Sequence, residues 1–150
     1  WFVYLYGLFM VAEDEIFEGM MIRLHFPSNI YGRMCLDRGC FVEALRDLSK
    51  DKELKPSEIY DIFSKQSSEV VILLLATCSS ERTKKYAELY FNKYYTSGEI
   101  ELNGDDLIGM GMEPGASFND VFKALRDARI NGQVTSRDEE IVLVESQFLK

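Results

Sequence analysis

Apolar residues recur every three or four positions along nearly the whole chain, a spacing that places them on one face of an α-helix. Few stretches alternate apolar with polar residues for long enough to specify a β-strand. The pattern therefore predicts an all-α protein. In its first third we expect a helix over about residues 1–13, a second that stops before Pro27, and a third that Ser28 caps.

The middle of the chain continues this helical pattern. Gly39 is expected to separate the third helix from a fourth over residues 41–48, whose apolar positions form one stripe. Residues 70–76 are apolar on every side of a helix. We therefore expect a central buried helix there, with Ser67 or Ser68 as its cap.

Proline and glycine mark the ends of the remaining elements. Pro56 predicts a helix start, because proline is tolerated in a first turn, and a further helix is expected over residues 80–95 with its stop near Gly98. Glycine becomes frequent beyond that position. We therefore expect two domains, a helical body over residues 1–98 and a smaller tail over residues 99–150 made of short helices and tight turns.

The tail carries a spaced pattern of glycine, proline and apolar residues. It has the form L-x-G-x-D-L-x-x-x-G-x-x-P-G, then a helix, then A-x-x-x-G-x-V. The matching residues are Leu102, Gly104, Asp106, Leu107, Gly111, Pro114, Gly115, Ala128, Gly132 and Val134. This layout resembles the C-terminal region of the tRNA nucleotidyltransferase / poly(A) polymerase family, except that Ala116 stands where that family usually has proline.

The resemblance implies the body and tail of a multi-domain enzyme. In that family a catalytic head adds nucleotides to an RNA 3′ end, using Mg²⁺ and ATP or CTP, and the helical C-terminal part holds the tRNA. A Gly-Ser loop followed by a strand with Asp-x-Asp is not found in this sequence, which begins at Trp1 inside an apolar run. We therefore expect a fragment without the N-terminal catalytic head, with no catalytic residue, metal site or cofactor of its own. Its expected partner is tRNA, bound at the acceptor arm and elbow.

Composition and charge restrict this interpretation. The chain has 150 residues, 47% of them hydrophobic, which is enough for one compact domain or two small ones. Its first apolar run is too short to span a bilayer and lacks a basic leader, which favours a cytoplasmic protein without a membrane segment. Three cysteines and one histidine supply no four-ligand metal set. A net charge of −8 argues against RNA binding by bulk electrostatics, so a local basic face is required.

The turn over residues 111–116 is one candidate contact with RNA. It leads into a helix, so backbone N–H groups at residues 115–118 can point outward and bind a phosphate. The candidate residues are Gly115, Ala116 and Ser117. The alternative explanation is that the glycines only allow a left-handed turn and close helix packing.

Basic side chains form two further candidates. Lys123, Arg126 and Arg129 fall within one arc of the tail helix and can either follow a phosphate backbone or pair with neighbouring carboxylates on a solvated face. Lys84 and Lys85, with Arg82 and Lys93, interleave with Tyr86, Tyr90, Tyr94 and Tyr95. This second group suits base stacking, and it equally suits a core stripe with a basic rim.

Two interpretations without RNA or metal chemistry stay open. Asp105 and Asp106 are adjacent at a helix start, which favours capping over metal binding. The acidic balance and the many aromatic residues also suit a helical protein interaction or dimerisation domain that has no affinity for RNA and forms a homodimer.

Overall fold

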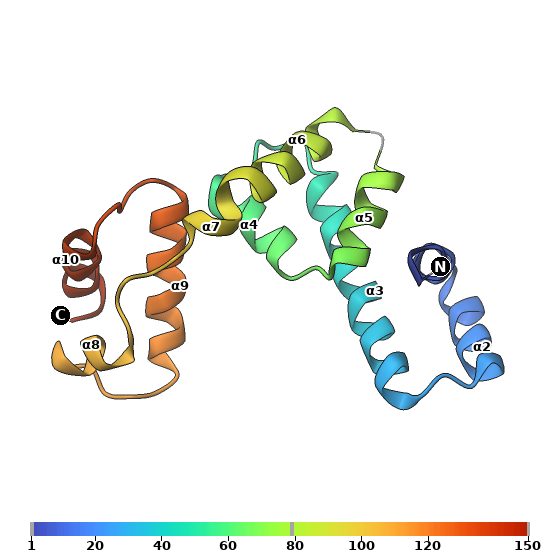
Figure 1. Cartoon of the computed structure of the whole chain (residues 1–150), viewed down its shortest axis with the longest axis horizontal. Helices are drawn as coiled ribbons and strands as arrows, with labels where there is room; N and C mark the ends of the chain where they lie inside the picture. Colours follow the sequence, from blue (N-terminus) through green and yellow to red (C-terminus); the bar gives the residue numbers. More distant parts are fainter. Residues whose placement is uncertain (1, 79, 150) are drawn as a thin grey trace. The chain divides into compact units, whose positions relative to one another are not determined.

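The computed structural model describes residues 2–78 and 80–149, so Trp1 of the first expected helix lies outside the described residues. All regular secondary structure within these ranges is helical, which confirms the predicted all-α class (Figure 1). The helices are α1 (Phe2–Met10), α2 (Asp14–Leu24), α3 (Ser28–Leu48), α4 (Pro56–Ser64), α5 (Ser68–Thr77), α6 (Glu81–Leu89), the π-helical turn η1 (Tyr90–Tyr94), α7 (Tyr95–Ser97), α8 (Gly104–Gly109), α9 (Ser117–Ile130) and α10 (Arg137–Phe148).

The predicted break at Gly39 is wrong, because α3 runs through it without interruption. A glycine inside a helix costs about 1 kcal/mol relative to alanine. Burial of Met34 on one side of Gly39, and of Phe41 and Ala44 on the other, offsets that cost. A side chain at residue 39 would meet nothing within 4 Å, so the glycine neither allows a close contact nor ends the helix.

Helix starts in the middle of the chain follow the sequence more closely. α4 begins at Pro56, as predicted. Ser67 is the cap of α5, and its hydroxyl accepts a hydrogen bond from the backbone N–H of Val70 at 3.4 Å. The expectation that α5 is buried on every side is wrong, since Ile72 is half exposed while Leu74 is fully buried.

Two compact units make up the chain. The first comprises residues up to Glu53 together with Asp61–Ala87, and the second comprises Leu54–Tyr60 together with the chain from Glu88 onward. The boundary between body and tail at residue 98 stays a prediction. The short segment 54–60 joins the tail through the side chain of Asn131, which accepts from the N–H of Ser57 at 3.1 Å and donates to its hydroxyl at 3.0 Å.

The first unit packs α1, α3 and α5 together. Tyr6 and Phe9 of α1 are fully buried, and the Tyr6 hydroxyl donates to Asp37 at 2.8 Å. Burial, followed by the contact with Asp37, raises the pKa of Tyr6 to about 12. Arg38 of α3 donates to the backbone carbonyls of Phe9 at 2.6 Å and Met10 at 3.4 Å, so a cation satisfies the C-terminal carbonyls of α1.

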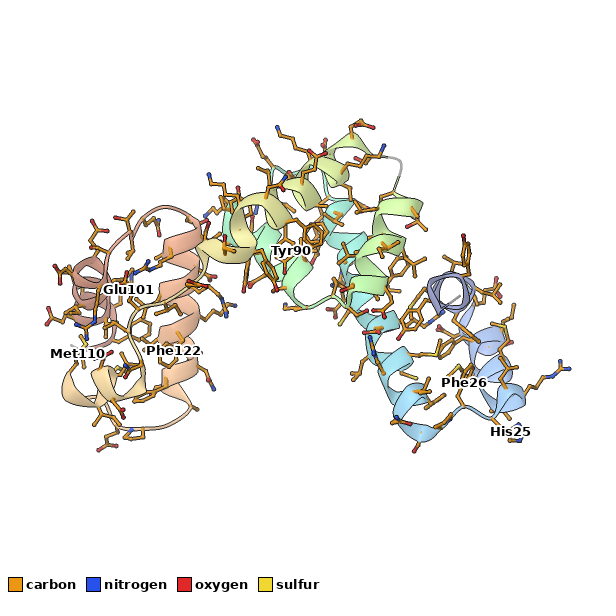
Figure 2. All side chains as sticks on the ribbon, viewed as in Figure 1. His25, Phe26, Tyr90, Glu101, Met110 and Phe122 are labelled. Atoms are coloured by element: carbon orange, nitrogen blue, oxygen red, sulfur yellow. The ribbon has the colours of Figure 1, made fainter. Side chains whose placement is uncertain are left out.

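The second unit has its own core between α8, α9 and α10. The fully or nearly fully buried residues are Leu102, Leu107, Val121, Leu125 and Val144. Met110 and Phe122, labelled in Figure 2, are among the partly buried side chains that pack against them. This unit contains the whole glycine pattern of the tail, and the candidate RNA contacts on α9 belong to it.

Candidate RNA interface

The short helix α8 is held at its start by a capping box. Asn103, which the sequence analysis did not single out, accepts from the N–H groups of Asp105 at 2.8 Å and Asp106 at 3.1 Å. Asp106 accepts in return from the N–H of Asn103 at 2.9 Å. The predicted cap at Asp105 or Asp106 is therefore corrected to Asn103, because Asp106 sits three residues into the motif. The other carboxylate oxygen of Asp106 accepts from Arg137 at 2.6 Å, so both oxygens of this side chain have structural partners.

Two glycines of the pattern end helices in the left-handed conformation. Gly111 has φ +95° and Gly132 has φ +72°. After α8, the N–H of Gly111 donates to Ile108 at 2.9 Å and that of Met112 to Leu107 at 3.0 Å. After α9, Gly132 and Gln133 donate to Arg129 and Ala128 at 3.0 and 2.8 Å in the same arrangement. Both ends are Schellman motifs, whose left-handed residue is usually glycine because it has no Cβ.

The apolar positions of the pattern are buried in the same unit. Leu102, Leu107, Ala128 and Val134 are each no more than 5% exposed. A side chain at Gly104 would meet the ring of Phe118 at 3.7 Å, which is ordinary contact. Most of the pattern thus specifies helix ends and core packing, so residues that contact a ligand have to be sought at its exposed positions.

The turn that enters α9 is an exposed part of the pattern. Pro114, Gly115, Ala116 and Ser117 are all exposed, and a side chain at Gly115 would meet nothing within 4 Å. Gly115 also has no positive φ, so neither packing nor backbone conformation demands glycine there. The backbone N–H of Phe118 donates to the carbonyl of Gly115 at 3.1 Å. Because the N–H of Phe118 is already bonded within the turn, it does not belong to the N–H groups that can face a phosphate.

Arg129 of the predicted basic row lies in a network of ion pairs. Its Nε donates to Glu140 of α10 and its Nη2 donates to Glu101 at 2.6 Å. The Arg129 side chain is 14% exposed and that of Glu140 is 0% exposed. Burial opposes the charge of Arg129, but the hydrogen bonds with Glu101 and Glu140 raise its pKa above the usual value. Its charge is thus neutralised inside the unit instead of facing outward.

Glu140 is the residue of this region that the sequence analysis missed. Besides the hydrogen bond from Arg129, the Glu140 carboxylate accepts from the backbone N–H groups of Glu101 at 3.2 Å and Leu102 at 2.9 Å. Glu101 is labelled in Figure 2. A buried charge requires such partners. The sequence contains one signal that Glu140 is buried. Glu140 is four residues before the apolar Val144, so the two side chains lie on the same face of α10.

The other two cations of the row differ from Arg129 and from each other. Lys123 is exposed. Arg126 is partly buried, with its guanidinium 5.5 Å from the centre of the Tyr60 ring. Among the described residues no carboxylate pairs with Arg126, and its buried Nε has no hydrogen-bond partner. The row thus contains one exposed cation, one cation over an aromatic ring and one neutralised cation.

The second basic cluster is also divided by the fold. Tyr86, Tyr90 and Tyr94 are buried, so they form a core stripe, while Tyr95 is 65% exposed. Arg82 donates to the carbonyls of Leu48 at 3.2 Å and Lys50 at 2.7 Å, which assigns it a structural role.

Lys84 and Lys85 are exposed on α6 within the first unit. Lys84 donates to Glu81 at 2.8 Å, and this hydrogen bond raises the pKa of Lys84.

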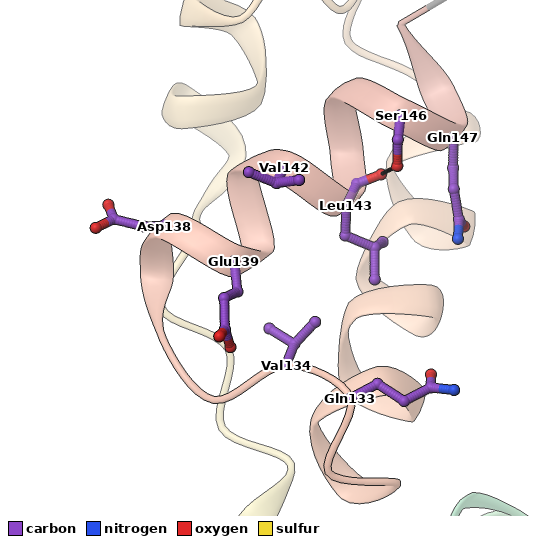
Figure 3. Close-up of a pocket in the computed structure, with 8 residues that line it drawn as sticks. All are labelled: Gln133, Val134, Asp138, Glu139, Val142, Leu143, Ser146 and Gln147. Atoms are coloured by element: carbon purple, nitrogen blue, oxygen red, sulfur yellow. Dashed lines mark hydrogen bonds between the residues drawn. The ribbon is translucent and has the colours of Figure 1, made fainter.

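A shallow depression of about 440 Å³ lies on α10 and the turn before it (Figure 3). Its lining residues are Gln133, Val134, Asp138, Glu139, Val142, Leu143, Ser146 and Gln147. Glu139 accepts from the backbone N–H and hydroxyl of Thr135 at 2.6 and 3.0 Å, and these hydrogen bonds lower the pKa of its carboxyl group. Two carboxylates at this depression repel phosphate, so we do not include it in the candidate RNA interface.

Within residues 2–78 and 80–149, no group of three or more His, Cys, Asp or Glu side chains is arranged to hold a metal ion. None of the helices described in the structure is both long and apolar enough to cross a bilayer.

Comparison with known proteins gives one relative to report. Over 147 residues the chain is 27% identical to an A-adding tRNA nucleotidyltransferase of Geobacter sulfurreducens, and the match covers 94% of the chain. The expected resemblance to tRNA nucleotidyltransferases is confirmed. The chain spans only 16% of the length of that relative. No family model and no solved structure matches the chain.

Proposed function

We propose that this chain binds and positions tRNA as part of a longer tRNA nucleotidyltransferase or poly(A) polymerase-like enzyme. The observation that carries the proposal is the match of 94% of the chain to 16% of an A-adding tRNA nucleotidyltransferase. In this proposal a catalytic head outside the chain transfers the nucleotide with Mg²⁺ and ATP or CTP. The helices described above contact the acceptor arm and elbow of the tRNA.

On α9 the proposed contacts are Lys123 and Arg126, together with the exposed turn at Gly115, Ala116 and Ser117. Lys123 is exposed and Arg126 has no carboxylate partner in the described structure, so both cations can face phosphate. Arg129 is assigned a different role, since Glu101 and Glu140 already neutralise it. It positions α9 within the unit and does not itself bind RNA.

Lys84 and Lys85 on α6 form a separate proposed contact in the first unit. Lys85 is exposed, and Lys84 shares its charge with Glu81. Because exposed ion pairs contribute little and are screened by salt, phosphate can replace Glu81 at small cost. This contact is expected to be weaker than the one on α9.

Recognition by these groups is expected to depend on shape and backbone. An RNA duplex presents a shallow minor groove with 2′-hydroxyls and few readable base edges. With a net charge of −8, the chain cannot attract RNA by its overall field, so a small number of local cations must supply the contacts. A shallow dependence of affinity on salt follows from that small number.

The test is a binding titration of the chain with tRNA and with an RNA duplex of unrelated sequence, each at two salt concentrations. We expect salt-sensitive binding that prefers tRNA. In the variant Lys123→Gln/Arg126→Gln the dissociation constant should rise. The slope of log affinity against log salt concentration should become shallower by about two units, because each lost phosphate contact removes about one unit.

A matched control removes the same charge elsewhere. Arg23 and Lys65 are exposed, and Arg23→Gln/Lys65→Gln changes the net charge as much as the test variant does. If both double variants weaken binding equally, the α9 contact is wrong and only the overall charge matters. If the unmodified chain binds neither RNA, the proposed function itself is wrong.

A further inference from the structure

Two exposed aromatic side chains stand on the π-helical turn that follows α6. Phe91 of η1 is 54% exposed and Tyr95, the first residue of α7, is 65% exposed. Large aromatic side chains are usually buried or placed where they contact a partner. Single π-turns inside α-helices occur frequently at functional sites. Packing in the core of the second unit does not account for these two exposed rings.

The wide turn brings these rings against a buried one. The N–H of Tyr95 donates to the carbonyl of Tyr90, five residues earlier. In a regular α-helix residues five apart are rotated by about 140° from each other, and the wider π-turn brings them closer to the same side of the helix. The ring of Tyr90 lies 5.9 Å from that of Tyr95 and 5.1 Å from that of Phe91, edge to face in both pairs.

These contacts hold the exposed rings in place. Tyr90 is 6% exposed, and its ring is also 5.8 Å from that of Tyr60. Edge-to-face aromatic pairs contribute beyond the area they bury and fix the planes of both rings. Phe91 and Tyr95 therefore present ordered aromatic surfaces to solvent, supported from below by Tyr90.

Two cations of the second unit lie over aromatic rings, one over Tyr60 next to Tyr90 and one over Tyr94 in η1. The guanidinium of Arg126 lies 5.5 Å from the centre of the Tyr60 ring, and the Lys93 ammonium lies 5.8 Å from the centre of the Tyr94 ring. No carboxylate within the described ranges pairs with Arg126. Aromatic surfaces next to unneutralised cations match a ligand that has both flat rings and negative charge.

We propose that Phe91 and Tyr95 form a stacking site for unpaired bases of an RNA strand, whose phosphates face Arg126 and Lys93. Base stacking on aromatic side chains tolerates any sequence, because every base has a π-face. The exposed Glu88 and Glu99 lie nearby in the chain and reduce the attraction of the cations, so stacking supplies most of the affinity. The proposal rests on the proposed function and adds to it a site for single-stranded RNA, which shares Arg126 with the proposed phosphate contacts on α9.

The test uses the whole chain and a short single-stranded oligoribonucleotide with one 2-aminopurine, whose fluorescence falls when the base stacks. We expect quenching on binding. In Phe91→Ala/Tyr95→Ala the quenching should disappear and the dissociation constant should rise by about tenfold or more. Phe91→Tyr/Tyr95→Phe keeps both rings and should bind like the unmodified chain, which separates the rings from the tyrosine hydroxyl.

Val142→Ala is the matched control, because Val142 is also a large exposed apolar residue of the second unit. It should leave binding and quenching unchanged. Circular dichroism and the melting temperature of each variant show whether it keeps the fold. A folded double variant that binds and quenches like the unmodified chain would overturn the stacking site, and so would an equal loss of duplex and single-strand binding.

Two other outcomes locate the error. If the unmodified chain binds tRNA with salt sensitivity but does not bind the single strand, the stacking site is wrong and the proposed function stands. If it binds no RNA, both are wrong. If the aromatic variant only lowers the mass measured by sedimentation, with RNA binding unchanged, the exposed rings form a protein contact instead.

Discussion

The two ends of α9 are constructed in different ways. At its C-terminal end, Gly132 completes a Schellman motif, Asn131 holds Ser57, and Arg129 is bound by Glu140 and Glu101. At its N-terminal end, Ala116 makes no side-chain cap and the residues from Pro114 to Ser117 are exposed. Groups that serve the fold are thus concentrated at one end of the helix, and the residues at the other end are exposed.

The largest expected effect on stability is at the C-terminal end of α9. Glu140→Gln removes a buried negative charge from Arg129 and from the N–H groups of Glu101 and Leu102. Removing one partner of a buried ion pair costs about 3–5 kcal/mol. Because Glu101 remains as a partner of Arg129, we expect the free energy of unfolding to fall by about 3 kcal/mol. Denaturant unfolding measures this loss.

Glu145→Gln is the control, because Glu145 is exposed on the same helix. It should change the free energy of unfolding by less than about 0.5 kcal/mol. Equal effects of the two variants would contradict the structural role assigned to Glu140.

A pair of glycine variants sharpens the comparison directly. Gly132→Ala should destabilise the protein by about 1–2 kcal/mol, because φ of +72° is unfavourable for a residue with a Cβ. Gly115→Ala should be neutral or stabilising by up to about 1 kcal/mol, since its φ is not positive and a methyl group there meets nothing within 4 Å. Thermal unfolding of both variants under the same conditions measures the difference. A greater loss for Gly115→Ala would reverse the assignment of the two ends.

The smallest effect concerns the position where the chain departs from the family's pattern. Ala116 has φ −59°, which the proline ring also adopts, and it lies just before the first residue of α9. Ala116→Pro should therefore stabilise the protein by about 0.4–1 kcal/mol, mainly by restricting the unfolded chain. A melting temperature that rises by a few degrees supports this account. A fall in melting temperature would mean that the N–H of Ala116 has a role in the fold.

Local sequence signals predicted where several helices start and end. Pro56, Ser67 and Gly98 mark boundaries in the structure close to where the sequence placed them, because proline, serine caps and glycine act through their own backbone or through residues a few positions away. The α8 cap was placed at Asp105 or Asp106 instead of Asn103, since asparagine and aspartate are both good capping residues and only the backbone path distinguishes them.

The sequence by itself determined the all-α class, most helix ends and the glycines that end α8 and α9, since these depend on short-range backbone preferences. Tertiary structure decided that α3 continues through Gly39, that Leu54–Tyr60 joins the second unit, and that Glu140 neutralises Arg129. Each of these depends on partners distant in the chain, whose burial and charge outweigh local preference. For the same reason the three cations of α9, which look equivalent in sequence, have three different environments in the fold.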